Sequence, residues 1–278
     1  MVVPIRFLQS GFVCVVLTLV ALPSVAASYT FSNTTDIVMS ENTNNPLTPA
    51  SPYPSTINVS GLNGQVIADM TVTLNGFSHT FPSDASVLLV GPGGQMTILM
   101  SEAGGQNADP VSNLTISFND NSPIPLPILD SLFSETFRPG VLNPGQPLPF
   151  NFPAPAPTNT ANAPVALSVF KNTDPDGIWS LYIVDDSVDD AGSISGGWSL
   201  NLSVGVPLTA AQAGSNIVFS WPQITGQTFA LQYSTNASNS NGWTSAPGIL
   251  AQKSGRNVVT NLNTNGLYAP RFYRLIKQ

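Results

Sequence analysis

The amino-acid sequence predicts an all-β protein, a β-sandwich or jelly roll followed by a small second β-sandwich. Short stretches in which apolar and polar residues alternate recur along the chain, and turns rich in Gly, Pro and Asn separate them. No stretch of helical length carries an apolar period of 3.6 residues. Charged residues make up only 8% of the 278 residues, against about a quarter in average soluble proteins. Amides and hydroxyls therefore supply most of the polar surface.

Two strands that we expect at residues 178–184 and 198–204 give the clearest pattern. Apolar and polar side chains alternate in both, and a Trp lies at the start of each, at Trp179 and Trp198. We therefore expect both strands to pack into one sandwich core. The other expected strands cover residues 28–33, 55–59, 67–74, 86–90, 96–100, 114–118, 165–170, 216–221, 228–234, 257–261 and 271–276.

Residues 123–157 interrupt the strand pattern. The segment begins P-I-P-L-P and ends L-N-P-G-Q-P-L-P-F-N-F-P-A-P-A-P, and Pro cannot donate a backbone hydrogen bond to a sheet. We expect a long crossover laid over the surface of the sandwich. It serves either as a packed loop that covers a sheet or as a polyproline-like surface for a partner protein.

Charge is distributed unevenly along the chain. All Asp and Glu residues lie at or before Asp190, whereas every charged side chain after Pro207 is basic. This asymmetry predicts an acidic domain at residues 28–206 and a basic module at residues 207–278. The side chains that we expect in the core of the module are Val218, Trp221, Phe229, Leu231, Tyr233, Trp243, Val259, Phe272 and Leu275.

The N-terminus has the pattern of a secretory signal peptide, residues 1–27. Arg6 supplies positive charge, residues 11–22 are apolar, and Pro23 precedes small residues that end at Ala27. We expect cleavage after Ala27 and a location outside the cell or at the cell envelope; the alternative is a retained anchor. Cys14, the one cysteine, lies in this segment, so the mature chain would hold no disulfide and no cysteine nucleophile.

Several motifs occur in order across residues 28–206. They are N-V-S-G at 58–61, V-T-L-N-G-F-S-H-T-F-P-S-D at 72–84, V-L-L-V-G-P-G-G at 87–94, F-N-D at 118–120, D-P-D-G-I-W-S-L at 174–181 and G-S-I-S-G-G-W-S-L at 192–200. In order and spacing they resemble the P domain, or Homo B domain, of kexin- and furin-like subtilisin proprotein convertases. The chain departs from the family at Ala85, where Leu is usual, and at Asp176, where Asn is common.

That resemblance implies a jelly-roll fold of the galactose-binding-like kind and an association with proteolysis, because the family's P domain follows a serine endopeptidase domain. Residues 207–278 are similar to a short fibronectin-III-like module. The stretches that carry this second similarity are F-S-W-P at 219–222, L-Q-Y-S-T-N at 231–236 and R-F-Y-R-L at 271–275.

Catalysis has little support in the residues themselves. A Ser-His-Asp triad would have to use His79, the one histidine, and no G-x-S-x-G motif occurs. We expect His79 to be structural and the chain not to be an enzyme; a hydrolase that uses His79 is the alternative. A zinc site is not expected, because one His and no mature Cys cannot build the usual ligand set. Nor is a glycosidase expected, because the carboxylates lie in hydrophilic turns.

Calcium is the cation that the acidic turns favour, because it binds carboxylate, amide and carbonyl oxygens that loops between strands can supply. Several carboxylates crowd into residues 185–190 and repel one another, and a bound cation would relieve that repulsion. The alternative is a solvated acidic loop with no ion. The expected ligands are Asp84, Asp120, Asp185, Asp186, Asp189 and Asp190.

The expected function is that of an exported binding or structural module, with a protein or polysaccharide surface as its ligand. No membrane span is expected after signal cleavage, and nucleic acid is not expected because the larger domain is acidic. One alternative is an accessory role in proteolysis beside a separate subtilisin-like protease. Another is a hydrolase in its own right.

Overall fold

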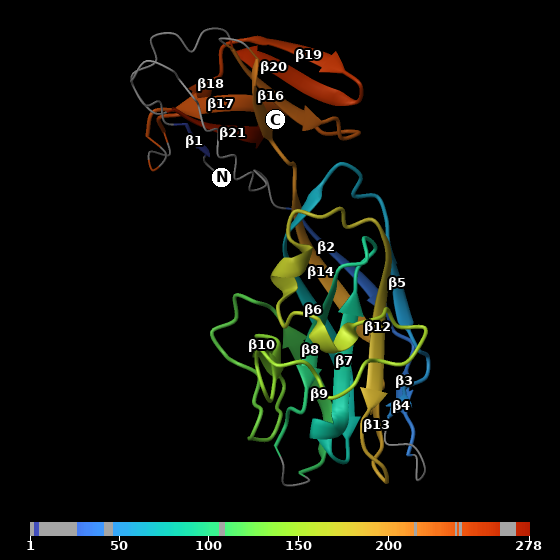
Figure 1. The fold of residues 1–278 in the computed structure, drawn as a ribbon. Coiled ribbons are helices and arrows are strands. Elements are labelled where there is room, and N and C mark those ends of the chain that lie inside the picture. The colour runs from blue at the N-terminus through green and yellow to red at the C-terminus, as the bar shows by residue number, and fades with distance from the viewer. Residues whose placement is uncertain are drawn as a thin grey trace. The chain divides into compact units, whose positions relative to one another are not determined.

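The structure is a computed structural model that describes residues 3–5, 27–41, 47–105, 109–213, 216–236, 238, 241–261 and 271–278 (Figure 1). Most of these residues lie in strands, and the only helices among them are three short 3-10 turns, η1 (Pro82–Asp84), η2 (Thr160–Asn162) and η3 (Leu167–Phe170). None of the described helices is long and apolar enough to cross a bilayer. The predicted all-β fold class is therefore confirmed.

The chain forms two compact units. The larger unit comprises Ser28–Gly61 and Asp69–Leu202, and the smaller one comprises Leu62–Ala68 and Ser203–Gln278 together with the described residues up to Ala27. The division near the C-terminal side falls at residues 202/203, a few residues before the boundary at 206/207 that we expect from the charge distribution. The predicted signal peptide lies outside the described residues, apart from Val3–Ile5 and Ala27.

The larger unit is a β-sandwich of two sheets. In the first sheet the order is β10-β9-β6-β13-β3, and β14 pairs with β6 and β2; in the second the order is β11-β8-β7-β12-β4, and β5 pairs with β12. The first sheet contains β2 (Ala27–Asn33), β3 (Ile37–Met39), β6 (Val66–His79), β9 (Val111–Phe118), β10 (Glu135–Phe137), β13 (Gly192–Ile194) and β14 (Trp198–Gly205). The second contains β4 (Thr48–Pro49), β5 (Ser55–Val59), β7 (Ala85–Val90), β8 (Met96–Ser101), β11 (Gly140–Val141) and β12 (Gly177–Asp185).

Both predicted Trp anchors lie in the core. Trp179 and Trp198 are fully buried. The indole N–H of Trp198 in β14 donates to Ser55 Oγ in β5, at 3.0 Å, and so joins the two sheets. The indole of Trp179 donates to the carbonyl oxygen of Pro175, at 2.9 Å. Both buried N–H groups therefore have a partner, which a buried donor needs to avoid a desolvation cost.

The Pro-rich crossover is a packed cover on the second sheet. Val141 and Phe152 of this segment are buried in one cluster with Tyr182 and Val184 of β12. Its backbone carbonyls accept hydrogen bonds from tyrosine hydroxyls, for example Pro155 from Tyr182 at 3.3 Å. Of the two alternatives for residues 123–157, the structure shows the packed loop.

The strand predicted at residues 165–170 is wrong. The chain forms η3 there because the carboxylate of Asp120 accepts the backbone N–H groups of Leu167, at 2.8 Å, and Ser168, at 2.7 Å. A side chain that satisfies these two donors gives the backbone an alternative to the sheet ladder.

The smaller unit has two four-stranded sheets, of order β15-β16-β20-β19 and β1-β21-β17-β18. Their strands are β1 (Val3–Ile5), β15 (Thr209–Ala213), β16 (Asn216–Pro222), β17 (Phe229–Ser234), β18 (Thr244–Ser245), β19 (Ile249–Lys253), β20 (Arg256–Asn261) and β21 (Arg271–Lys277). β1 belongs to the segment that we expect to be cleaved, so on that expectation the mature module would keep β21-β17-β18 as its second sheet.

Three residues of the predicted module core are wrong. Ile217, Phe219 and Tyr273 are buried in place of Val218 and Phe272. Side chains alternate strictly between the faces of a strand. Buried Trp221 therefore requires Phe219 and Ile217 inside, and it turns Val218 outward. Trp243 is half-buried, with the Arg274 guanidinium 4.2 Å above its ring. The predicted core positions that are confirmed are Trp221, Phe229, Leu231, Tyr233, Val259 and Leu275, of which Tyr233 is partly buried.

Candidate functional site

The turns at one end of the sandwich bring several acidic residues together. β12 ends at Asp185, which pairs with Ala85 at the start of β7. The backbone N–H of Asp186 donates to the carbonyl oxygen of Asp84, at 2.9 Å. β8 ends nearby, because β7 and β8 are antiparallel neighbours, and Glu102 follows it directly. These strand ends therefore place three turns of the second sheet side by side.

The first sheet contributes from the same end. β6 ends at His79, which pairs with Gly192 of β13. The hydroxyl of Thr80 donates to Oδ1 of Asp190, at 2.8 Å, and fixes that carboxylate beside the end of β6. We use the name acidic cluster for the residues whose charges act on one another here: Asp84, Glu102, Asp185, Asp186 and Asp190.

His79 and Asp185 form a buried pair in the floor of this cluster. Their side chains are 0% and 2% exposed, and His79 Nε2 lies 3.3 Å from Asp185 Oδ2. His79 Nδ1 accepts the backbone N–H of Phe81, at 3.1 Å, so the Nε2 atom carries the proton that faces Asp185. The contact between Nε2 and Oδ2 does not meet hydrogen-bond geometry, and neither of the two facing atoms has a hydrogen-bond partner. The imidazole is thus enclosed, and both of its nitrogens face protein groups.

Burial and mutual repulsion raise the pKa of two carboxyls in the cluster. Burial is the larger cause for Asp84, whose pKa rises to about 6, and the charges of Asp185 and Asp190 add to it. Burial also raises the pKa of Asp186, to about 7, with further contributions from Asp84, Glu102 and Asp185. Hydrogen bonds from Ser187 to Asp84 and from Ser86 to Asp186 act in the opposite direction. Near neutral pH the cluster therefore takes up protons readily.

Two of the predicted ligands do not join the cluster. Asp189 is exposed, and its φ of 65° makes it a turn residue in the left-handed region. Asp120 follows β9, whose Phe118 pairs with Val72, seven positions along β6 from His79. Seven residues of strand span about 23 Å, so Asp120 lies at the opposite end of the sandwich. Its carboxylate holds the start of η3.

The donor chemistry of the cluster fits a hard cation. Carboxylate oxygens predominate, and calcium prefers oxygen ligands. Two of these carboxyls, Asp84 and Asp186, have raised pKa values, first because burial desolvates them and second because neighbouring carboxylates repel their charge. Among the described residues no three Asp, Glu or His side chains already converge as a ligand group. Calcium would therefore require the half-buried carboxylates of Asp84 and Asp186 to turn toward one ion.

Glu102 and the pairing of His79 with Asp185 were not predicted from the sequence. Glu102 stands alone between β8 and the two glycines at 104 and 105, and its φ of 51° marks a turn. Only the antiparallel register of β7 with both β8 and β12 brings it to Asp186. That register has no local signal in the sequence.

No family model matches the chain, and a search of curated proteins finds no match.

Proposed function

We propose that this chain is an exported, non-catalytic binding protein built on a P-domain-like β-sandwich, with a small fibronectin-III-like module at its C-terminus. The single observation that carries the proposal is the state of His79. It is the one histidine of the sequence, its side chain is fully buried, and its two nitrogens face the Phe81 amide and the Asp185 carboxylate. A general base must reach the proton that it abstracts, and an enclosed imidazole does not.

The alternative role, that of an accessory to a separate subtilisin-like protease, is tested by the same experiment as the binding function. The mature chain, tagged at its C-terminus, is incubated with cells and secreted material of its host, and the bound fractions are identified. Saturable retention on a polysaccharide or envelope fraction supports the proposed function. A subtilisin-like protease that co-purifies in stoichiometric amount supports the accessory role, and no saturable retention on any fraction contradicts both.

We further propose that Ca²⁺ stabilises the turns of the acidic cluster. The support is physical: carboxylates that share a partly desolvated site repel one another, and a divalent cation removes this cost more fully than protons do at neutral pH. Asp84, Asp185, Asp186 and Asp190 are the predicted ligands that the fold brings together. Asp120 and Asp189 are not part of this proposed site.

A further inference from the structure

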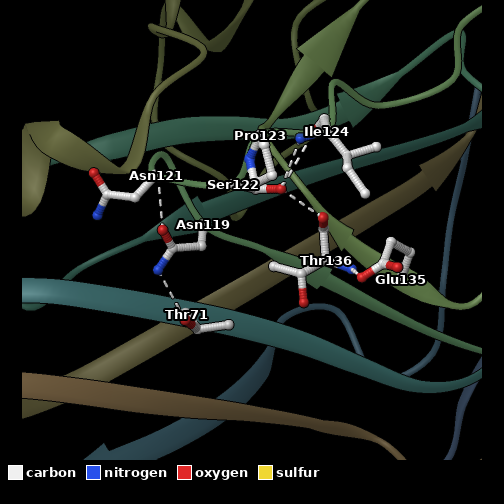
Figure 2. Close-up of a pocket in the computed structure, with 8 residues that line it drawn as sticks. All are labelled: Thr71, Asn119, Asn121, Ser122, Pro123, Ile124, Glu135 and Thr136. Atoms are coloured by element: carbon white, nitrogen blue, oxygen red, sulfur yellow. Dashed lines mark hydrogen bonds between the residues drawn. The ribbon is translucent and has the colours of Figure 1, made fainter.

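A pocket lined by polar and apolar groups lies at the end of the sandwich opposite the acidic cluster, and Figure 2 shows its lining residues. The loop after β9 forms one wall, β10 forms a second, and Thr71 of β6 lies at the base. The cavity has a volume of about 330 Å³, which is within the range of small-ligand sites. It is therefore large enough for a molecule of the size of one ring.

Internal hydrogen bonds hold the walls of the pocket in place. The amide nitrogen of Asn119 donates to the carbonyl oxygen of Met70 and to Oγ1 of Thr71, both at 3.0 Å. The hydroxyl of Ser122, itself buried, donates to the carbonyl oxygen of Thr136 at 2.7 Å and so ties the loop to β10. Figure 2 shows these bonds between the lining residues. A pocket whose walls are fixed before binding loses little entropy when a ligand enters.

Both donors and acceptors remain for a ligand. Asn121 donates one amide N–H to Asp69 Oδ1, at 3.1 Å, which leaves its second N–H as a donor and its amide oxygen as an acceptor. Glu135 uses one carboxylate oxygen to accept the N–H of Thr136, at 2.7 Å, and keeps the second. The hydroxyl of Thr136 can donate or accept. These groups suit a ligand that carries several O–H donors.

The lining side chains favour an uncharged ligand. None of the lining residues is basic, and the guanidinium of Arg138, which is not among them, donates to the backbone carbonyl oxygen of Ser122, at 2.7 Å. Asp69 directs both oxygens to the amides of Asn119, at 3.3 Å, and Asn121. The remaining carboxylate, Glu135, is exposed, and a single exposed charge attracts a cation only weakly in water.

The lining residues also offer a flat aromatic ligand no stacking partner, because no aromatic side chain is among them. Pro123 and Ile124 instead supply a small apolar wall beside the polar groups. A pyranose ring has this pairing of surfaces, with C–H groups on one face and hydroxyls around its edge. The chemistry of the pocket is therefore that of a neutral sugar.

We propose that this pocket binds one neutral, hydroxyl-rich saccharide unit of a polysaccharide. The inference rests on the proposed binding function and deepens it by naming the ligand class and the residues that contact it: Thr71, Asn121, Pro123, Ile124, Glu135 and Thr136. Asn119 and Ser122 are positioning residues, since they act by holding Thr71 and Thr136.

Calorimetric titration of the mature chain with soluble polysaccharides tests the proposal. The neutral probes are a glucan, a galactan and a mannan, and the charged probes are cationic chitosan and anionic polygalacturonate. We expect a neutral probe to bind, and Asn121→Ala and Thr136→Val each to weaken it about tenfold, the usual effect of one lost hydrogen bond. Glu135→Gln, which keeps an oxygen acceptor, should change the affinity by less than about threefold.

Gln252→Ala is the matched control, because Gln252 lines a different amide-rich cavity in the smaller unit. It should leave the affinity unchanged. All variants should have the melting temperature of the wild-type chain. If Asn121→Ala and Thr136→Val both bind a neutral probe with wild-type affinity, the probe binds elsewhere. That result would reject this pocket as the site but not the proposed binding function. If the wild type prefers cationic chitosan and Glu135→Gln loses that preference, the proposal of a neutral ligand is wrong. If the wild type binds none of the probes, the saccharide assignment is wrong. The retention of the tagged chain on host cells and secreted material then tests the binding function separately.

Discussion

His79 shows how one residue limits what the chain can do. Its buried side chain packs 6.2 Å from the ring of Phe77, centroid to centroid, in a stacked arrangement, and its Nε2 atom faces Asp185. Gly192 of β13 pairs with it across the sheet. These contacts enclose the imidazole among protein groups, and a structural role stays our prediction for His79.

Gly192→Ala is expected to destabilise the larger unit by about 1–3 kcal/mol, the usual cost of overpacking a core. A Cβ atom at this position would lie 2.1 Å from His79 Cδ2 and 2.6 Å from the carbonyl oxygen of Ser78. The backbone oxygen cannot move without disturbing the pairing of β6 with β13. Urea unfolding measures the free energy of unfolding.

The matched control for this glycine is Gly93→Ala. The nearest atoms to a Cβ at Gly93 belong to the side-chain amide of Gln95, a flexible group on an exposed turn. The free energy of unfolding of Gly93→Ala should differ from that of the wild type by less than about 0.5 kcal/mol. Equal losses in both variants would show that the close packing of β13 on His79 is not as described.

At the scale of elements, the acidic cluster makes stability depend on pH. The folded-state pKa values of Asp84, about 6, and Asp186, about 7, lie above the ordinary value of 3.8. The folded chain therefore binds more protons than the unfolded chain between about pH 4 and pH 7, and its stability falls as the pH rises through this window. In EDTA, the melting temperature should be higher at pH 5 than at pH 7.5.

Asp186→Asn should flatten this pH profile, because it removes the carboxyl with the highest pKa. Asp130→Asn, which removes an exposed carboxylate outside the cluster, should leave the profile unchanged. A melting temperature that rises from pH 5 to pH 7.5 in EDTA would contradict the assignment of raised pKa values to these turns.

Calcium is expected to raise the melting temperature at pH 7.5. An ion at a hundred times its dissociation constant adds about 2.7 kcal/mol of stability, which corresponds to roughly 5–10 °C for a domain of this size. The shift should be smaller at pH 5, where protons already occupy the carboxyls, and it should be lost in Asp186→Asn. Differential scanning calorimetry with calcium and with EDTA measures it, and magnesium serves as the control ion. Identical curves in calcium and EDTA would rule out the site.

The sequence predicts elements where the local pattern is strong. The alternation in β12 and β14 placed Trp179 and Trp198 in the core, and β5 has the predicted bounds. Prediction failed where a distant group decides the outcome, as at η3, where the carboxylate of Asp120 binds the backbone. In β16 the predicted alternation placed Val218 in the core, whereas its neighbours Ile217 and Phe219 are the buried residues.

The candidate site was predictable in part for the same reason. Asp185, Asp186 and Asp190 lie close in the sequence, so their crowding is visible without a structure. Asp84 joins them through the pairing of β7 with β12, and Glu102 through that of β7 with β8. Asp120, like the other predicted ligands, is an Asp in a polar turn. The register of β9 with β6 nevertheless places it at the end of the sandwich opposite the acidic cluster.

At the scale of the whole molecule, the larger unit carries two sites of different chemistry at opposite ends of its sandwich. The acidic cluster, with its buried pair of His79 and Asp185, is the site at which we propose a bound cation. The pocket of Figure 2, which is lined by amides, hydroxyls and a short apolar wall, is the site that we propose for a saccharide. The pair of His79 and Asp185 therefore lies at the opposite end of the sandwich from the pocket that we propose as the binding site.

Peptide hydrolysis by the pure mature chain tests the central claim, that the protein binds without catalysis, most directly. Turnover of a fluorogenic peptide library is measured together with labelling by a serine-directed covalent probe, for the wild type and for a folded His79→Gln variant. We predict no turnover above buffer and no label in either protein. Turnover that grows with protein concentration, and that disappears in His79→Gln while the melting curve shows a folded chain, would contradict the account.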